Sequence, residues 1–129
     1  MFCDSRGMPA RCLVVDDNER FLFVAQRLLG AGEVLEVEGA TDIASAIDVF
    51  DRFHPDVVLI DVSLGTESGF GLAHMLIERA PDIASRIIII STRSGEDYEG
   101  LIEDAAVAGF ISKSDLSVEA VQQLVAGLG

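Results

Sequence analysis

Four consecutive apolar residues that end in a single acid constrain the fold of this chain more than any other stretch. The run Val57 to Ile60 is typical of a strand buried on both faces, as in a parallel sheet, and Asp61 follows at its carboxyl end. Glycines and small polar residues from Val62 to Gly69 then turn the backbone before a helical pattern begins. In open α/β sheets, ligands bind in a crevice at the carboxyl ends of the strands. Asp61 occupies such a position, so we expect it to be a functional residue.

Three further apolar runs also end in polar side chains. Asp16 and Asp17 follow the first run, Ser91 follows a run of isoleucines, and Lys113 follows a short final run. The carboxyl ends of parallel strands lie at one edge of a sheet. The sequence therefore predicts that these side chains and Asp61 lie close together.

Helical patterns separate the runs, so the chain reads as five strand–helix units. The first helix is predicted to turn Phe21, Val24, Ala25 and Leu28 inward. Apolar and acidic residues alternate over 35–38, which is typical of a half-exposed strand at a sheet edge. Right-handed crossovers place helices on both faces. We therefore predict an α/β fold of the doubly wound (βα)5 type with a five-stranded parallel sheet.

The fourth predicted helix carries small apolar residues on its inner face. That face consists of Leu101, Ile102, Ala105 and Ala106. An alanine removes less apolar area from water than a leucine, so this helix is held less firmly than its neighbours. We expect it to be the movable element of the fold.

Length and charge narrow the classes of function. The 129 residues are predicted to form an irregular leader at 1–10 and one folded domain at 11–129. A net charge of −13 argues against direct nucleic-acid binding by this domain, because phosphate contacts need cationic side chains. No stretch is apolar enough for a membrane span or a signal peptide, and both cysteines read as reduced thiols. We expect a cytoplasmic protein that does not bind membranes.

Each acid also has a purely structural interpretation. An acid between a strand and a helix often caps the helix, but only one of Asp16 and Asp17 can occupy that position. Asp61 alone would pass for a turn residue, and Lys113 alone for a solvated lysine. Together the three acids would repel one another until a proton or a cation relieved them. Magnesium, which prefers oxygen ligands, is the cation that we expect.

Four segments of the chain, taken together, resemble a known family. The segments 14–18, 59–64, 90–92 and 109–113 are similar to those of the receiver domain of two-component response regulators, of the chemotaxis-regulator type. The resemblance covers roughly residues 11–128. It implies a flavodoxin-like fold with the strand order 2-1-3-4-5.

The resemblance also implies a chemical role for the acids. Asp61 would accept a phosphoryl group from a histidine kinase. Asp17 and Asp61, with the carbonyl group of Ser63, would bind Mg²⁺, and Asp16 would bind it directly or through water. The chain would thus be a phosphoacceptor that promotes its own phosphorylation and dephosphorylation, and not a turnover enzyme.

The remaining motif residues are implied to hold the phosphoryl group and to transmit its presence. Ser91 and Lys113 would contact the phosphoryl oxygens. Phe110 would turn inward when Ser91 moves, and together they would form the switch. The output surface would be the fourth helix, the fifth strand and the fifth helix, which could also join two copies as a homodimer.

The chain departs from the family pattern at three positions. Ser114 stands where the family usually has proline, so we expect a trans peptide bond after Lys113, since a cis bond without proline costs about 3 kcal/mol. Gly65 replaces another common proline and is predicted to loosen the loop after Asp61. Ser91 replaces the more frequent threonine. None of these changes removes a catalytic group.

Two other functions remain open on the sequence. A degenerate receiver would serve only as a protein-interaction module. A Mg²⁺-dependent phosphohydrolase with an aspartyl-phosphate intermediate usually has its nucleophile on the first strand as Asp-x-Asp, whereas here Asn18 and Glu19 follow Asp17.

Overall fold

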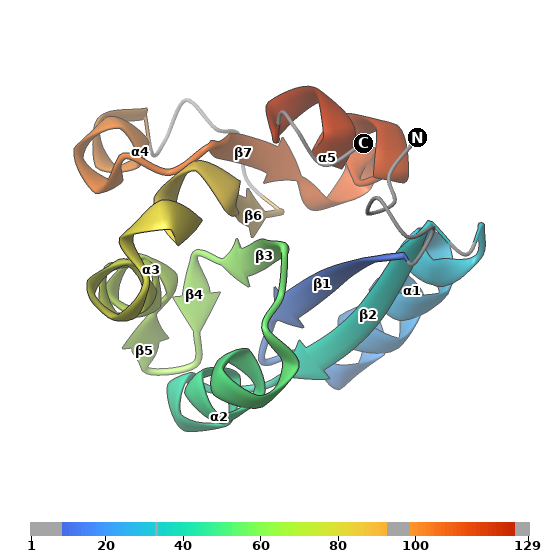
Figure 1. Cartoon of the computed structure of the whole chain (residues 1–129), viewed down its shortest axis with the longest axis horizontal. Coiled ribbons are helices and arrows are strands. Elements are labelled where there is room, and N and C mark those ends of the chain that lie inside the picture. The colour runs from blue at the N-terminus through green and yellow to red at the C-terminus, as the bar shows by residue number, and fades with distance from the viewer. Residues whose placement is uncertain (1–8, 33, 93–98, 126–129) are drawn as a thin grey trace.

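A five-stranded parallel sheet forms the centre of the molecule (Figure 1). The computed structural model describes residues 9–32, 34–92 and 99–125. The sheet strands are β1 (Ala10–Val15), β2 (Leu35–Ala40), β3 (Val57–Asp61), β6 (Ile87–Ser91) and β7 (Gly109–Ser112). They lie in the order β2-β1-β3-β6-β7, and all neighbours are parallel. Numbered among themselves, these strands have the predicted order 2-1-3-4-5, and the strand at 35–40 is at an edge as predicted.

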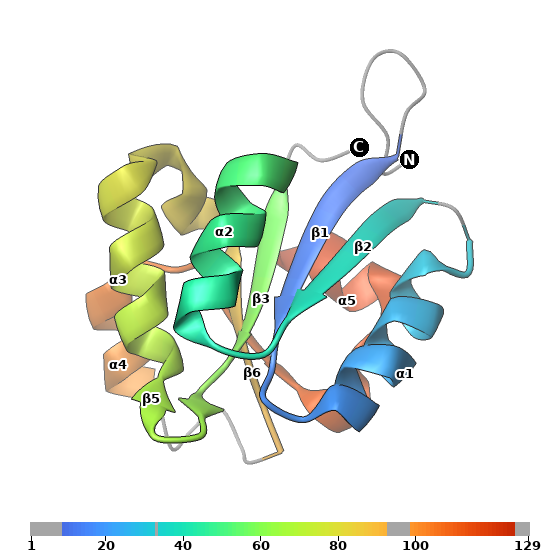
Figure 2. The same ribbon diagram turned by 90° about the horizontal axis from the view of Figure 1, so that it is seen from below.

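Helices cover both faces of the sheet (Figure 2). The helices are α1 (Glu19–Gly30), α2 (Ile43–Phe53), α3 (Gly69–Arg79), α4 (Glu99–Ala105) and α5 (Val118–Leu124). Helices α1 and α5 pack on one face, and α2, α3 and α4 pack on the other. Short 3-10 turns, η1 (Pro81–Arg86) and η3 (Lys113–Asp115), complete the connections. The predicted doubly wound fold is therefore confirmed.

The predicted division of the chain at residue 10 stays a prediction. Residues 1–8, which make up most of the predicted leader, lie outside the described part, and β1 begins at Ala10. Within the described ranges, every helix is too short or too polar to cross a lipid bilayer.

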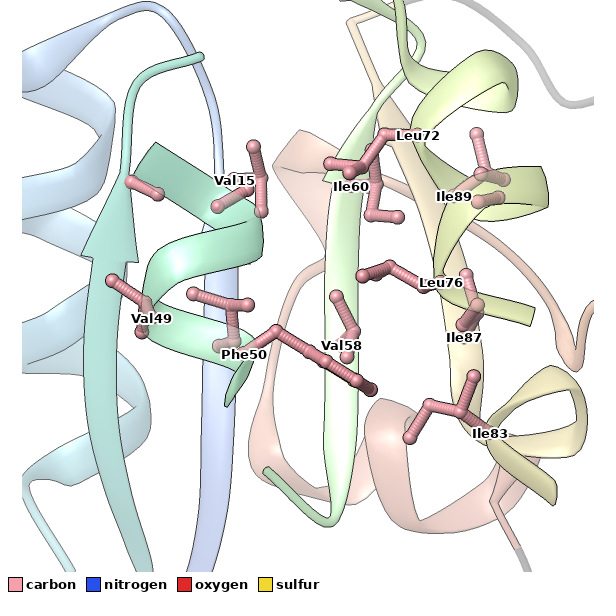
Figure 3. Packing of buried hydrophobic residues seen from close by; sticks show 14 of the residues in the cluster. Val15, Val49, Phe50, Val58, Ile60, Leu72, Leu76, Ile83, Ile87 and Ile89 are labelled. Carbon is pink, nitrogen blue, oxygen red and sulfur yellow. The ribbon is translucent and has the colours of Figure 1, made fainter. Parts of the chain in front are cut away.

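Two hydrophobic cores lie on opposite faces of the sheet. Side chains alternate between the faces, so that Val58 and Ile60 of β3 enter one core while Val57 and Leu59 enter the other. Figure 3 shows the first core, where α2, α3 and η1 pack against β3 and β6. All five residues of β3 and of β6 are buried. The two central strands β3 and β6 thus rigidly support the residues at their carboxyl ends, Asp61 and Ser91.

The predicted inner face of α1 is correct for Ala25 and in part for Phe21, but wrong for Val24 and Leu28. Val24 and Leu28 are 52% and 47% exposed, and Phe21 is only partly buried. The residues that α1 buries are Leu22, Ala25 and Leu29. Residues 21–25 are apolar without interruption, so two helical faces fit the pattern almost equally well. Packing against the sheet selects the face one residue further along.

Helix α4 is anchored even more sparsely than predicted. Ala105 is buried and Ile102 partly buried, but Leu101 is 52% exposed. Ala106 lies beyond the end of the helix with a φ of 57°. The described part of the helix, Glu99–Ala105, ends before Ala106, so that residue cannot belong to its inner face.

The loop after Asp61, which Gly65 was predicted to loosen, forms a small hairpin. Strands β4 (Ser63–Leu64) and β5 (Glu67–Ser68) pair in antiparallel fashion. Gly65 occupies the left-handed region at the turn with a φ of 68°, which suits glycine better than any other residue. The backbone N–H of Gly69 then donates to the carbonyl of Val62 at 2.8 Å, closing the hairpin beneath α3.

We expect Gly69→Ala to lower the free energy of unfolding by about 2 kcal/mol or more, because the close approach leaves no room for a side chain. A Cβ at Gly69 would lie 1.9 Å from the carbonyl oxygen of Asp61, and that backbone cannot give way easily. Gly71→Ala in the same helix is the matched control, since its Cβ would meet only Ser68 Cβ at 3.8 Å. Chemical denaturation should show the control to be more stable than the parent by about 0.5–1 kcal/mol. Equal effects of the two substitutions would contradict the packing.

Candidate functional site

The polar residues predicted from the sequence lie at the carboxyl ends of the sheet strands. Asp16 comes directly after β1, Asp61 ends β3, Ser91 ends β6 and Lys113 comes directly after β7. Figure 2 shows the turn from β1 into α1 and the β4–β5 hairpin at this same end of the molecule. The parallel topology therefore gathers groups that are up to 97 residues apart in the sequence.

Three carboxylates form one cluster at this end. Asp16, Asp17 and Asp61 each offer an oxygen atom, and these atoms lie within 4.8 Å of one another. Asp16 is fully buried and Asp61 nearly so, whereas Asp17 is exposed. The cluster therefore has two acids in its floor and one at its solvent-facing rim.

The cluster is not a helix cap. Asn18 caps α1, and its side-chain oxygen accepts hydrogen bonds from the backbone N–H groups of Arg20 at 3.0 Å and Phe21 at 3.2 Å. Asp16 Oδ1 accepts from the backbone N–H of Asn18 at 2.8 Å, which fixes the carboxylate in place. The capping interpretation of Asp16 and Asp17 is thus wrong, because the next residue takes that position.

Lys113 brings the compensating charge. Its Nζ lies 2.5 Å from Asp16 Oδ2 and 3.3 Å from Asp61 Oδ2, and its side chain is 14% exposed. The expected trans bond between Lys113 and Ser114 is confirmed, since the described residues contain no cis peptide. The ammonium reaches the acids from the sheet-edge side without the family's proline.

Two of the predicted residues lie around the cluster, and a third lies apart from it. Ser91 is buried, and Ser63 begins the hairpin with its side chain exposed. Phe110 is partly buried on β7 and packs against the core beneath α3 and α4. The structure thus places Phe110 against the first core, on the strand that Lys113 follows.

Phe21 is a site residue that the sequence reasoning missed. It was assigned to the core, against which it does pack, but the Lys113 Nζ also lies 4.4 Å from the centroid of its ring. An aromatic residue four positions after Asp17, in the first turn of the helix that leaves the acids, was the available signal.

Comparison with known proteins agrees with this arrangement of strand ends. The family model of the response regulator receiver domain matches residues 12–125. The chain belongs to this family. Receiver domains of two-component systems are thus the class in which its site is to be understood.

Individual relatives are similar at moderate identity. The transcriptional regulatory protein DegU of Brevibacillus brevis is 25% identical over 119 residues, which are 89% of this chain and 50% of the relative. The chain therefore spans about half the length of that regulator. The crystal structure of the chemotaxis protein CheY4 of Vibrio cholerae has a TM-score of 0.80 at 21% identity and covers 92% of this chain and 99% of that one.

Another structural neighbour is a response regulator protein from Burkholderia pseudomallei, solved with a phosphorylated aspartic acid, a calcium ion and citrate. It has a TM-score of 0.77 at 22% identity, covering 92% of this chain and 67% of that one. At these identities both crystal structures establish that this receiver domain has their fold.

The donor set of the receiver's acidic cluster fits a divalent cation. Three carboxylates within 4.8 Å supply the hard oxygen ligands that Mg²⁺ prefers. Asp16 Oδ2 is buried and makes no hydrogen bond of acceptable geometry, although the Lys113 ammonium lies close beside it. That oxygen atom therefore keeps lone pairs that a cation bound by the three acids could use.

The charges of the cluster shift the pKa values of two groups. Burial raises the pKa of Asp61, and the nearby Asp16 raises it further, while Lys113 and the backbone N–H of Ser63 act in the opposite direction. Burial alone would lower the pKa of Lys113, but the carboxylates of Asp16 and Asp61 raise it overall. Lys113 therefore stays charged, and repulsion among the acids is only partly relieved.

We expect Lys113→Met to lower the free energy of unfolding of the metal-free protein by about 3 kcal/mol or more, because it leaves a buried carboxylate without its cation. Asp16 is fully buried, so it cannot turn to solvent. Adding Asp16→Asn to this variant should restore most of the loss. Urea denaturation of the single and double variants measures the coupling, and additive effects would show that the two charges do not interact.

Asp61→Asn should stabilise the metal-free protein at pH 7. The folded state raises the pKa of Asp61 above its ordinary value of 3.8, so its charge costs stability once the pH exceeds that range. The gain should therefore shrink as the pH falls from 7 toward 4, where the aspartic acid takes up a proton. Thermal melts at several pH values in the presence of a chelator test this, and a gain that does not depend on pH would contradict it.

Proposed function

We propose that this receiver domain acts in the cytoplasm as a Mg²⁺-dependent phosphoacceptor, taking a phosphoryl group from a histidine kinase onto Asp61. The observation that carries the proposal is the convergence of one ammonium and three carboxylates around the end of β3. The geometry suits phosphoryl transfer because both partners of that reaction are anions, and positive charge must offset their repulsion.

The proposed reaction forms one bond and breaks one. An oxygen atom of Asp61 attacks phosphorus, the phosphorus–nitrogen bond of the donor phosphohistidine breaks, and the electron pair leaves on the imidazole. Asp16, Asp17 and Asp61, with the carbonyl of Ser63, would hold a Mg²⁺ ion, whose chemistry is to neutralise charge on the phosphoryl oxygens. The product is an acyl phosphate that persists as a signal.

The remaining site residues receive positioning roles in this proposal. Lys113 supplies a compact positive charge within the cluster, where it already contacts Asp61. Ser91 ends the strand adjacent to β3 and can offer its hydroxyl group to a phosphoryl oxygen. Both residues are already at the carboxyl ends of their strands, next to the end of β3 or in contact with Asp61.

The proposed output surface consists of α4, β7 and α5. It is supported by the weak anchoring of α4 and by the place of β7 at the sheet edge, with β6 as its neighbour. A hollow of about 570 Å³ lies along β7 and α5. Its lining includes Phe110, Ile111, Ser112, Asp115 and Leu124. A phosphoryl group that drew Ser91 inward would favour another packing of Phe110 and α4, and this surface could also join two copies.

Two relatives support the proposal by analogy. The Burkholderia pseudomallei protein holds a phosphorylated aspartic acid and a calcium ion on the same fold. DegU is a transcriptional regulator about twice as long as the matched segment, so a DNA-binding function would belong to another part of such a protein. The net charge of −13 is consistent with a domain that does not itself contact DNA.

Incubation with acetyl phosphate and Mg²⁺ tests the proposed function. Intact-mass spectrometry should show one added phosphoryl group on the parent protein and none on Asp61→Asn. Asp48→Asn is the matched control, because this exposed acid on α2 lies outside the cluster. Uptake by Asp61→Asn at the parental rate would refute the assignment. A parent that neither binds Mg²⁺ nor takes up phosphate would be a protein-interaction receiver, and steady release of phosphate from phosphomonoesters would indicate a phosphohydrolase.

A further inference from the structure

The aromatic ring of Phe21 lies against the charged end of Lys113. The distance from Nζ to the ring centroid is 4.4 Å, well within the range of about 6 Å in which a cation is attracted to an aromatic ring. The backbone N–H of Phe21 donates to the capping Asn18, so the ring is fixed to the first turn of α1. The same turn fixes Asp16, because Asn18 donates to that carboxylate.

The ring differs from the other partners of Lys113. The ammonium contacts the carboxylates of Asp16 and Asp61, and both are also the groups that the proposed reaction would engage. Once those oxygens bind an ion or become modified, their hold on the ammonium weakens. The contact with Phe21 does not change, because an aromatic ring neither titrates nor binds Mg²⁺.

Lys113 needs such a support for a physical reason. Its ammonium is at the end of a flexible four-carbon stem, which can adopt many rotamers. The stem begins at the short turn η3, and the neighbouring Ser114 is exposed. Contacts with the ring and with two carboxylates leave the ammonium little freedom to turn toward solvent, consistent with the 14% exposure of the Lys113 side chain.

A second aromatic–cation pair on the same helix lies outside the site and serves as a comparison. Phe23 is 59% exposed, and Arg27 lies over its ring at 5.6 Å, one helical turn further on. That pair lies on the solvent side of α1. Phe21 also packs at the edge of the second core, but it is only partly buried, and the buried side chains of α1 are Leu22, Ala25 and Leu29.

We propose that Phe21 is a positioning residue, whose ring keeps the ammonium of Lys113 aimed at Asp61 during phosphoryl transfer. The proposal rests on the proposed phosphoacceptor function of Asp61. It explains how this chain aims its lysine while having Ser114 in place of the family's usual proline. The ring acts from α1, and the ammonium that it contacts also lies 3.3 Å from Asp61 Oδ2.

The test compares Phe21→Leu, which keeps the apolar volume but removes the ring, with Phe21→Tyr, which keeps the ring. Phosphorylation by saturating acetyl phosphate and Mg²⁺ should slow by about 2- to 30-fold in Phe21→Leu, the range that the loss of one cation–ring contact predicts. Phe21→Tyr should stay within about twofold of the parent. Phe23→Leu, the matched control on the same helix, should not change the rate.

A spectroscopic readout separates positioning from a general structural effect. Protons above an aromatic ring resonate upfield, so the ε-methylene signals of Lys113 should move downfield in Phe21→Leu but not in Phe23→Leu. This measurement uses the metal-free protein and does not depend on phosphorylation. Phe21→Met serves as the second ring-free variant if Phe21→Leu does not fold.

The outcomes are distinguishable. A parent that takes up no phosphoryl group refutes the proposed function and with it this role of Phe21. An active parent whose rate is unchanged in the ring-free variants refutes the positioning role alone. Lys113 signals that do not respond to loss of the ring refute the contact itself. A slowed ring-free variant, with rescue by tyrosine and the expected shift of the signals, supports the proposal.

Discussion

Repulsion between buried carboxylates is the constraint on which the rest of this structure depends. Asp16 and Asp61 lie at the carboxyl ends of neighbouring strands in one cluster, and their burial as carboxylates requires a compensating positive charge. Lys113 provides that charge from the end of β7, which is separated from β1 by two strands. The ion pairs therefore tie the sheet edge to its centre. A site built in this way is poised for a cation, since one ammonium offsets the acids only in part.

The stiffness of the central strands makes this crowding possible. β3 and β6 are buried along their whole length between two cores, so Asp61 cannot move away from Asp16 without disturbing packed side chains (Figure 3). The hairpin after Asp61 adds a second restraint, since Gly69 packs directly against the backbone of Asp61. Glu67 at the hairpin accepts a hydrogen bond from the first N–H of α2 at 3.2 Å. The loop that follows the proposed phosphoacceptor is thus held to the fold.

The sequence was sufficient for the sheet and for the charged part of the site, because buried parallel strands are short apolar runs and their carboxyl ends meet at one edge. Asp16, Asp61 and Lys113 could be brought together on that basis alone. The inner face of α1 could not be predicted from the sequence, since an uninterrupted apolar stretch fits more than one helical face. The contact of Phe21 with Lys113 was equally hidden, because it depends on the angle at which α1 leaves the strand. Local pattern carries no information about such angles.

The position of Lys113 also links the site to the proposed output surface. The residue follows β7 without a break, and Phe110 lies three residues earlier on the same short strand. An edge strand has one neighbour, so a small displacement of β7 disrupts fewer hydrogen bonds than one of β3 would. Any change in the charge of the groups that Lys113 contacts therefore acts on β7, the strand that can be displaced with the loss of fewest hydrogen bonds. Under the proposed function, Asp61 accepts the phosphoryl group on the rigid central strand β3. Lys113, which follows the edge strand β7, responds to the resulting change in charge.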